Sequence, residues 1–397
     1  MGGTEFMSTG QKFQLKIHSS IQEIPKEEWN RLVSPDAVPF LDWDWLYILE
    51  KSGSVSPDMD WHPLHFCLWD QGQLAAAAPL YLRTSSGGEY LHDYFWAEAV
   101  MSIGKAWYPK MVGAPACTPA EGYRFLAAPE LDLHAATVTL LESIETLCTQ
   151  NQIPSVNLIW ADPQWSAVLP SLGYMAWDHN HLVWENENFS SFDDYLALFS
   201  KNQRKNIRKE YARHKEQGIS IKVVPGTEAT EEHYSRMFEF YTITNDMHVP
   251  WDARWFNEEW FILLEQHCRH STAFSEARLD STGEIIAMAI LIHKGDRIWG
   301  RFWGAFEDIR DLHFAVCYYA PMDWCIEKGI RYFDPGAGAS SHKLRRGFKA
   351  QRNRSYHKFF DPIVTKLFRD NIKAINRRDQ ARRDSLNELQ PYKKETD

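Results

Sequence analysis

Residues 330–348 read Ile-Arg-Tyr-Phe-Asp-Pro-Gly-Ala-Gly-Ala-Ser-Ser-His-Lys-Leu-Arg-Arg-Gly-Phe. The first four residues are mostly β-branched or aromatic and predict a short strand. Gly336 and Gly338 come soon after it, and glycine adopts positive φ angles and lets a ligand approach the backbone closely. Ligand loops in α/β proteins commonly follow strands in this way. The stretch therefore predicts a strand that leads into a ligand-binding loop.

A basic group follows the two glycines. His342, Lys343, Arg345 and Arg346 bring hydrogen-bond donors and positive charge into five residues. Such donors could bind an anion or stabilise a carbonyl oxygen on which negative charge develops. The alternative is a surface turn followed by a solvated basic patch. We predict catalytic roles for His342 and Lys343, and donor or substrate binding by Gly336, Gly338, Arg346, Gly347 and Phe348.

The elements before this loop form a regular series. From residue 219 the hydrophobic pattern predicts a strand, two helices, three strands, a helix and a final strand. These elements cover residues 219–224, 231–245, 251–267, 272–279, 285–293, 297–304, 312–328 and 330–333. Residues 12–185 show a similar order, with an aromatic, strand-like run at 89–101. We therefore predict an α/β fold with two similar domains, 7–185 and 186–361, followed by a basic C-terminal helix and tail at 362–397.

Composition and charge exclude several classes of protein. The six cysteines form no C-x-x-C pair, so we expect neither a zinc site nor a disulfide framework, and we predict a reducing compartment. The sequence has no run of about eighteen apolar residues. Its start, Met1-Gly-Gly-Thr-Glu-Phe, does not resemble a secretory signal, since it has neither a basic region nor an apolar core, and Met7 has the character of a natural start. We predict a cytoplasmic protein. A net charge of -10 disfavours nonspecific nucleic-acid binding, although residues 342–397 carry 16 Lys and Arg against 7 Asp and Glu.

Seven patches, in order, resemble one known family. They are Gly88-Glu-Tyr-Leu-His-Asp-Tyr-Phe-Trp-Ala97, Tyr108-Pro-Lys110, Thr118-Pro-Ala-Glu-Gly-Tyr-Arg124, Lys201-Asn-Gln-Arg-Lys-Asn-Ile-Arg-Lys-Glu210, Gly300-Arg-Phe-Trp-Gly304, Leu312-His-Phe-Ala-Val-Cys-Tyr-Tyr319 and the loop quoted above. The family is the Fem-like group of peptidoglycan biosynthesis/recognition proteins, which are predicted N-acyltransferases. Its members resemble two tandem acyl-CoA N-acyltransferase (GNAT) domains. In this chain the loop at 336–342 is one residue longer than the usual form.

The resemblance implies an activity and a set of substrates. It implies transfer of an acyl group from acyl-CoA, or an aminoacyl group from aminoacyl-tRNA, to an amine on a small molecule or peptide. It implies no tightly bound cofactor and no metal, and it adds Arg301, within Gly300–Gly304, to the binding residues. A non-catalytic glycan- or peptide-binding protein that retains the fold is the alternative, because no Gly-rich phosphate loop precedes His313.

Two further groups of residues are candidates for the reaction. Acyl transfer to an amine needs a general base, and His92 or Asp93 could serve, whichever of the two faces a groove. On a strand these neighbours would point to opposite faces. In the predicted helix at 201–217, Lys205 and Arg208 lie on one side and would suit the phosphates of tRNA or coenzyme A. A buried structural histidine and a solvated helix face are the respective alternatives.

Overall fold

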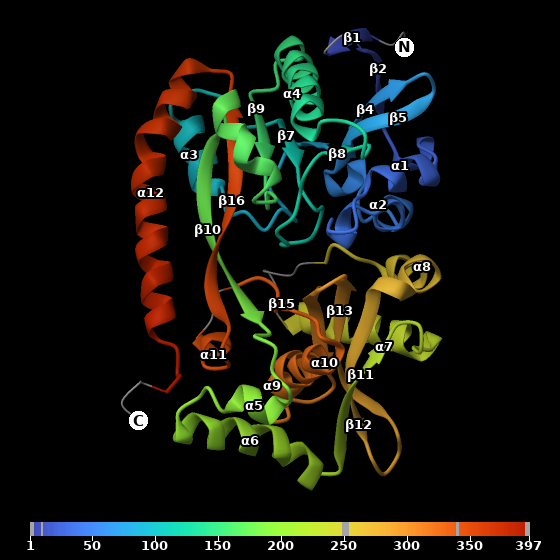
Figure 1. The fold of residues 1–397 in the computed structure, drawn as a ribbon, viewed down its shortest axis with the longest axis vertical. Coiled ribbons are helices and arrows are strands. Elements are labelled where there is room, and N and C mark those ends of the chain that lie inside the picture. The colour runs from blue at the N-terminus through green and yellow to red at the C-terminus, as the bar shows by residue number, and fades with distance from the viewer. Residues whose placement is uncertain (1–3, 9–10, 248–253, 339–340, 394–397) are drawn as a thin grey trace. The chain divides into compact units, whose positions relative to one another are not determined.

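The computed structural model describes residues 4–8, 11–247, 254–338 and 341–393 (Figure 1). The chain divides into two units, each built from two separate stretches of sequence. The first unit comprises Met1–His179 with Arg352–Gln380, and the second comprises Asn180–Gln351 with Ala381–Asp397. The predicted domains, 7–185 and 186–361, are each one continuous stretch of sequence, and their bounds stay a prediction.

The second unit contains one mixed sheet that follows the predicted meander. Its strand order is β11-β12-β13-β14-β15-β10, and only the β14–β15 pair among these described strands is parallel. The first eight residues of β13 are buried apolar residues, as expected for a central strand covered on both faces. The strands span Ile219–Pro225 (β11), Thr272–Leu279 (β12), Ile285–Lys294 (β13), Arg297–Ala305 (β14), Tyr332–Asp334 (β15) and Met175–Glu185 (β10).

A parallel pair needs a crossover between its strands, and a helical segment from Leu312 to Lys328 supplies it. This segment contains α9 (Leu312–Phe314), one π-helical turn (Ala315–Tyr319) and α10 (Ala320–Lys328). Single π turns inside helices often occur at functional sites. The other helices that lie in this unit are α5 (Phe192–Leu196), α6 (Lys201–Glu216), α7 (Glu231–Met247), α8 (Glu258–Cys268) and α11 (Ser341–Leu344).

The first unit contains a five-stranded sheet of the order β1-β2-β4-β5-β8. Its other strands, in the order β16-β9-β7-β6-β3, follow β10 in the strand order of the sheet named above, and among them β7 and β9 are parallel. The strands are β1 (Thr4–Ser8), β2 (Gln11–His18), β3 (His62–Pro63), β4 (His65–Asp70), β5 (Gln73–Ala78), β6 (Tyr81–Arg83), β7 (Lys110–Gly113), β8 (Leu126–Ala127), β9 (Ser155–Leu158) and β16 (Lys349–Phe359). The helices are α1 (Lys26–Leu32), α2 (Trp43–Lys51), α3 (Tyr94–Ser102), α4 (Leu133–Gln150) and a 3-10 segment at Trp165–Leu172.

Three elements pass from one unit into the other. β10 begins in the first unit, and its last residues, Trp184 and Glu185, pair with β15. β16 begins in the second unit, and its residues Tyr356–Phe359 pair with β9. The helix α12 (Pro362–Glu388) also crosses the division, after Gln380. Each unit therefore includes a strand from the other half of the sequence.

Two local predictions were wrong. The helix expected from residue 251 begins at Glu258, because the side chain of Asn257 accepts the backbone N–H of Trp260 at 3.1 Å and caps the helix there. Residues 251–253 of that prediction lie outside the described residues. The strand-like run at 89–101 is also wrong, since residues from Tyr94 onward form α3, whose Trp96, Ala97 and Val100 are buried in a hydrophobic cluster.

The described residues give two further facts about the class of protein. Within them, no helix combines the length and the apolarity that crossing a bilayer requires. The six cysteines are free thiols, and all are buried except Cys317, which is partly exposed. The thiol pKa values of Cys67 and Cys325 lie far above the ordinary value because burial disfavours a thiolate. These thiols are structural apolar residues rather than nucleophiles.

Candidate functional site

The parallel pairing of β14 and β15 ends abruptly. The register joins Arg297 to Tyr332 and ends where Trp299 meets Asp334. Pro335 follows, and a proline has no N–H with which to extend the ladder. Beyond this point lies a cavity of about 90 Å³, which we call the β14–β15 notch. It is lined by Ala289, Leu291, Gly300, Arg301, Phe302, Trp303, His313, Cys317, Tyr318 and Pro335.

A β-bulge in β14 lies where the strand stops pairing with β15, beside the β14–β15 notch. Leu291 of β13 pairs with Gly300, but the preceding Ile290 pairs with Phe302, so Arg301 is the extra residue. Bulges re-aim side chains and recur beside active sites. The positive charge of Arg301 acts on the buried carboxyl of Asp334, where it opposes the rise in pKa that burial causes. The structure thus places the predicted binding residue Arg301 at the notch.

The loop after β15 is held against β14 by a glycine. Gly336 has φ +81°, and a Cβ at this position would lie 2.8 Å from the carbonyl oxygen of Gly300. Its N–H donates to Oδ1 of Asp334 at 2.8 Å. Gly338 has a similar φ of +89°, but a Cβ there would meet no described atom within 4 Å. Only the first of the two predicted glycines is required by a close approach as well as by its backbone angle.

The side chain of Lys343 holds this loop by hydrogen bonds to its backbone. Its buried Nζ donates to the carbonyl oxygens of Gly336, Ala337 and Gly338 at 2.9, 2.9 and 3.1 Å. Burial lowers the pKa of the Lys343 ammonium to about 8, against the opposing attraction of Asp334. Because an ammonium has three N–H groups, these bonds occupy all of them. The geometry therefore gives Lys343 a positioning role, and direct contact with a reacting oxygen stays a prediction.

His342 lies in an aromatic and imidazole cluster beside the notch. Its Nε2 is 3.1 Å from the hydroxyl oxygen of Tyr318, and its ring centroid lies 5.9 Å from that of His313. Burial lowers the pKa of His342, as do the charges of Lys343 and Arg346. Burial and the same neighbours lower the pKa of His313 to about 4. Both imidazoles are therefore neutral at pH 7, which is the form that can accept a proton.

Arg346 is fixed by an ion pair that the sequence did not suggest. Its guanidinium donates to Oε2 of Glu210 at 2.6 Å and to the hydroxyl of Tyr319 at 2.7 Å, and Glu210 also accepts the Tyr319 hydroxyl. The same group lies 3.3 Å from the ring centroid of Phe314. Glu210 is an acid in an otherwise basic part of α6. No other feature of the sequence indicated that it would pair with a distant arginine. The predicted binding residue Arg346 thus joins the loop to α6 and to the crossover helix.

The last two predicted loop residues belong to the core. Phe348 is fully buried in a hydrophobic cluster that also contains Tyr195. Gly347 has φ +80°, and a Cβ there would overlap the hydroxyl of Tyr195, which donates to the carbonyl of Arg346 at 2.6 Å. These contacts give Gly347 and Phe348 packing roles, while their predicted part in binding stays a prediction.

In the first unit the side chains of His92 and Asp93 lie in different environments. His92 is exposed, whereas Asp93 is 2% exposed and accepts from Nζ of Lys110 at 2.7 Å. Glu89 accepts from the same Nζ at 2.7 Å. Burial lowers the pKa of Lys110, but the attraction of the two carboxylates outweighs it and the net change is upward. Beyond the Tyr108-Pro-Lys110 patch, the sequence has no local pattern that indicates this ion-pair cluster.

The first unit also has a parallel strand pair, but the space beyond it is filled. β7 and β9 pair as far as Gly113 and Leu158. Beyond them the fully buried Tyr123 packs on Gly113 so closely that a Cβ there would overlap its ring. The backbone N–H of Tyr123 donates to the carbonyl of Trp160 at 2.9 Å, and its hydroxyl donates to that of Pro79 at 2.8 Å. The notch of the second unit contains a cavity, and its counterpart contains Tyr123.

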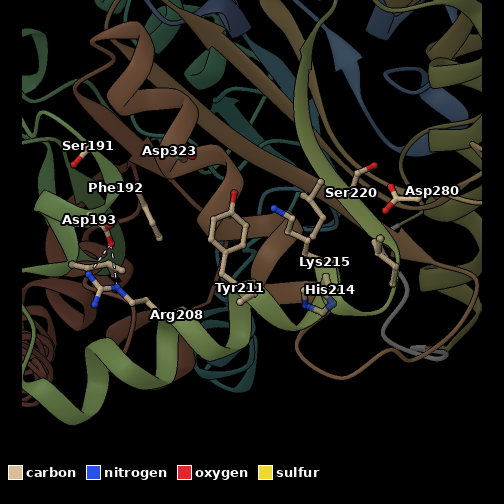
Figure 2. A pocket seen from close by; sticks show the side chains of 14 residues that line it. Ser191, Phe192, Asp193, Arg208, Tyr211, His214, Lys215, Ser220, Asp280 and Asp323 are labelled. Atoms are coloured by element: carbon tan, nitrogen blue, oxygen red, sulfur yellow. Dashed lines mark hydrogen bonds and ion pairs between the residues drawn. The ribbon is translucent and has the colours of Figure 1, made fainter.

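A larger cavity, of about 870 Å³, lies along α6 (Figure 2). We call it the α6 pocket. It is lined by Ser191, Phe192, Asp193, Leu196, Arg208, Tyr211, Ala212, His214, Lys215, Ile219, Ser220, Ile221, Asp280 and Asp323. Of the two predicted basic residues on α6, Lys205 is exposed and lies outside this lining, while Arg208 donates to Oδ1 of Asp193 at 2.8 Å.

The fold and the chain's relatives agree with the predicted class, an α/β protein of two tandem GNAT-like domains. A family model matches residues 20–394, and its family is FemAB-like, described as peptidoglycan biosynthesis/recognition. This chain belongs to that family. A search of curated proteins finds no relative of this chain.

Solved structures show the same architecture at low identity. The crystal structure of FemX is 11% identical, with a TM-score of 0.55 over 89% of this chain and 99% of that one. The C-terminal domain of a putative lysylphosphatidylglycerol synthetase from Agrobacterium fabrum is 12% identical, with a TM-score of 0.53 over 88% and 95%. A tandem GNAT protein from the clavulanic acid biosynthesis pathway is 10% identical, with a TM-score of 0.45 over 88% and 99%. At these identities the likeness concerns the fold alone.

The loop glycines provide a matched test of the notch geometry. Alanine at either position adopts a positive φ, which costs roughly 1–2 kcal/mol. Only Gly336→Ala also places a methyl group against the Gly300 carbonyl, and such overpacking costs about 1–3 kcal/mol more. Thermal unfolding should therefore show a clearly lower Tm for Gly336→Ala than for Gly338→Ala. Equal melting temperatures would mean that the loop does not rest on β14.

Proposed function

We propose that this chain is an acyltransferase that moves an acyl or aminoacyl group to an amine, with the β14–β15 notch as its reaction site. The observation that carries the proposal is the open notch beside His342 and Arg301, in contrast to the counterpart filled by Tyr123. Membership of the FemAB-like family supports the same class of reaction. The proposed donor is acyl-CoA or aminoacyl-tRNA, and the proposed acceptor is a peptide or small-molecule amine.

The notch has the size and lining for a carbonyl group in transfer. A volume of about 90 Å³ holds a group of a few heavy atoms, such as an ester or thioester carbonyl. β15 no longer pairs with β14 beyond Trp299, so the β14 backbone can offer N–H groups toward the cavity. Fixed donors aimed at an oxygen that gains negative charge lower the barrier for acyl transfer. Arg301 adds positive charge at the same place.

The proposed reaction is a direct transfer. The acceptor nitrogen attacks the carbonyl carbon, a C–N bond forms, and the C–S or C–O bond to the donor breaks. The amine loses a proton, and the leaving thiolate or alkoxide gains one. His342 is the proposed base, because its imidazole is neutral and half-buried beside the notch. The Tyr318 hydroxyl, 3.1 Å from Nε2, is placed to orient it.

Histidine variants test this assignment. His342→Ala should lower turnover by about 10²–10⁴-fold, the usual contribution of a general base. The matched control is His92→Ala, which removes the other predicted base from an exposed position. The measurement is transfer of labelled groups from acetyl-CoA or bulk aminoacyl-tRNA to a peptidoglycan-precursor peptide. Loss of activity in His92→Ala, with His342→Ala fully active, would overturn the assignment.

The same reaction has a predicted pH dependence. A base must be unprotonated, and the lowered pKa of His342 keeps it so below the ordinary histidine value of 6.5. The rate should therefore hold through pH 6.5 and fall only at lower pH. A fall in the rate whose midpoint lies at pH 6.5 or above would contradict this role for His342.

The basic side chains of α6 are proposed to hold a polyanionic donor. Lys205 is exposed, and we expect it to contribute more than Arg208, which is paired with Asp193. If tRNA is the donor, Lys205→Ala should reduce the slope of log affinity against log salt by about one unit, the loss of one phosphate contact. Lys51→Ala removes an exposed lysine from the first unit and serves as the control. Unchanged slopes in both variants would make α6 a solvated face.

A further inference from the structure

The α6 pocket has a different lining from the β14–β15 notch. The two cavities share no lining residue among those described, and neither His342 nor Arg301 faces the α6 pocket. Its volume of about 870 Å³ is within the range of small-molecule sites. Apart from Arg208, the proposed transferase reaction assigns no role to the residues that line this cavity.

One wall of the α6 pocket is apolar. Phe192 and Tyr211 contact each other with ring centroids 5.6 Å apart, and Leu196, Ile219 and Ile221 continue the surface. Apolar side chains of a ligand would be stabilised here by roughly 25 cal/mol per Å² removed from water. The wall therefore favours a ligand with an apolar body.

The polar groups of the pocket are not all satisfied by the protein. Asp193 and Arg208 pair with each other at one side of the view in Figure 2. Lys215, Asp280 and Asp323 also line the pocket, and their side chains have no hydrogen-bond or ion-pair partner among the described residues. A ligand can therefore meet one cationic and two anionic groups.

The carboxylate of Asp323 lacks a compensating cation. Burial raises its pKa, and the like charge of Glu327 raises it further. Its own charge also reaches Tyr211, whose pKa is raised to about 12 by burial and then by Asp323. Asp323 lines the same cavity as the aromatic wall of Phe192 and Tyr211. Lys215 is four residues after Tyr211 on α6, so the two side chains share a helix face.

We propose that the α6 pocket binds a short apolar peptide in its zwitterionic form, with the terminal carboxylate at Lys215 and the terminal amino group at Asp323. The apolar side chains lie on the wall of Phe192, Tyr211 and Leu196. The inference concerns binding and is independent of the proposed transfer reaction.

Other ligand classes fit these groups less well. A purely apolar chain would cover Lys215 and Asp323 without pairing them, and unpaired charges are costly to remove from water. A polyanion would meet Asp280 and Asp323. A polycation would satisfy the two aspartates but would be repelled by Lys215. A molecule with one charge of each sign, separated by an apolar body, pairs with Lys215 and Asp323, and of these three charges it leaves the exposed Asp280 to solvent.

Calorimetric titration with tri-leucine tests the proposal. The peptide with free ends should bind, and its N-acetylated and C-amidated forms should each bind about tenfold more weakly, since each has lost one charge-assisted contact. No detectable binding of free tri-leucine at millimolar concentration would overturn the proposal. Equal affinity of the free and blocked peptides would also overturn it, because it would mean that the site binds only the apolar side chains and makes no contact with the charged ends.

Variants assign each end of the peptide. Asp323→Asn should remove the preference for the free amino group, and Lys215→Gln the preference for the free carboxylate. Lys209→Gln is the matched control, since Lys209 is an exposed cation on α6 outside the lining. All three positions are exposed, so thermal melts should show folded proteins. Retention of both preferences in the first two variants would refute the assigned contacts.

Discussion

The end of the β14–β15 ladder at Pro335 is the constraint on which the candidate site depends. A parallel pair that stops after Trp299 and Asp334 leaves a cavity beyond the end of its pairing, with Gly300, Arg301 and Pro335 in the lining. The loop that follows must then turn sharply, and the positive φ of Gly336 allows it to rest on the Gly300 carbonyl. Lys343 holds the turned loop by three carbonyl contacts. The loop thus contacts the sheet through Gly336 and the basic group through Lys343.

The two units differ in what lies beyond the end of their parallel strand pairs. Both contain a parallel strand pair whose pairing ends inside the unit. In the first unit a buried tyrosine closes the space with two hydrogen bonds, to the carbonyls of Trp160 and Pro79. In the second unit the corresponding space is lined by Arg301, His313 and Tyr318. A large buried tyrosine favours stability, whereas a cavity lined with donors favours ligand binding.

The sequence predicted the elements better than the contacts between them. Periodicity alone placed β12 at Thr272–Leu279 with the observed bounds. The glycines and the histidine of the loop also predicted a site, and the structure has a cavity next to this loop, while the role of the site stays a prediction. The partnership of Arg346 with Glu210, 136 residues apart, depends on tertiary packing that no local pattern encodes. For the same reason the pairing of Asp93 with Lys110 was not foreseen, and a strand was expected where α3 lies.

The most direct test of the central claim is to observe the notch while a donor binds. Imidazole NMR signals of His313 and His342 can be assigned with single His→Gln variants and followed during titration with acetyl-CoA and with a non-hydrolysable aminoacyl-tRNA analogue. We expect one of these donors to shift both signals, since the two rings lie 5.9 Å apart beside the cavity, and to leave the exposed His92 unchanged. Binding of either donor that shifts His92 and leaves His313 and His342 unaffected would contradict the account.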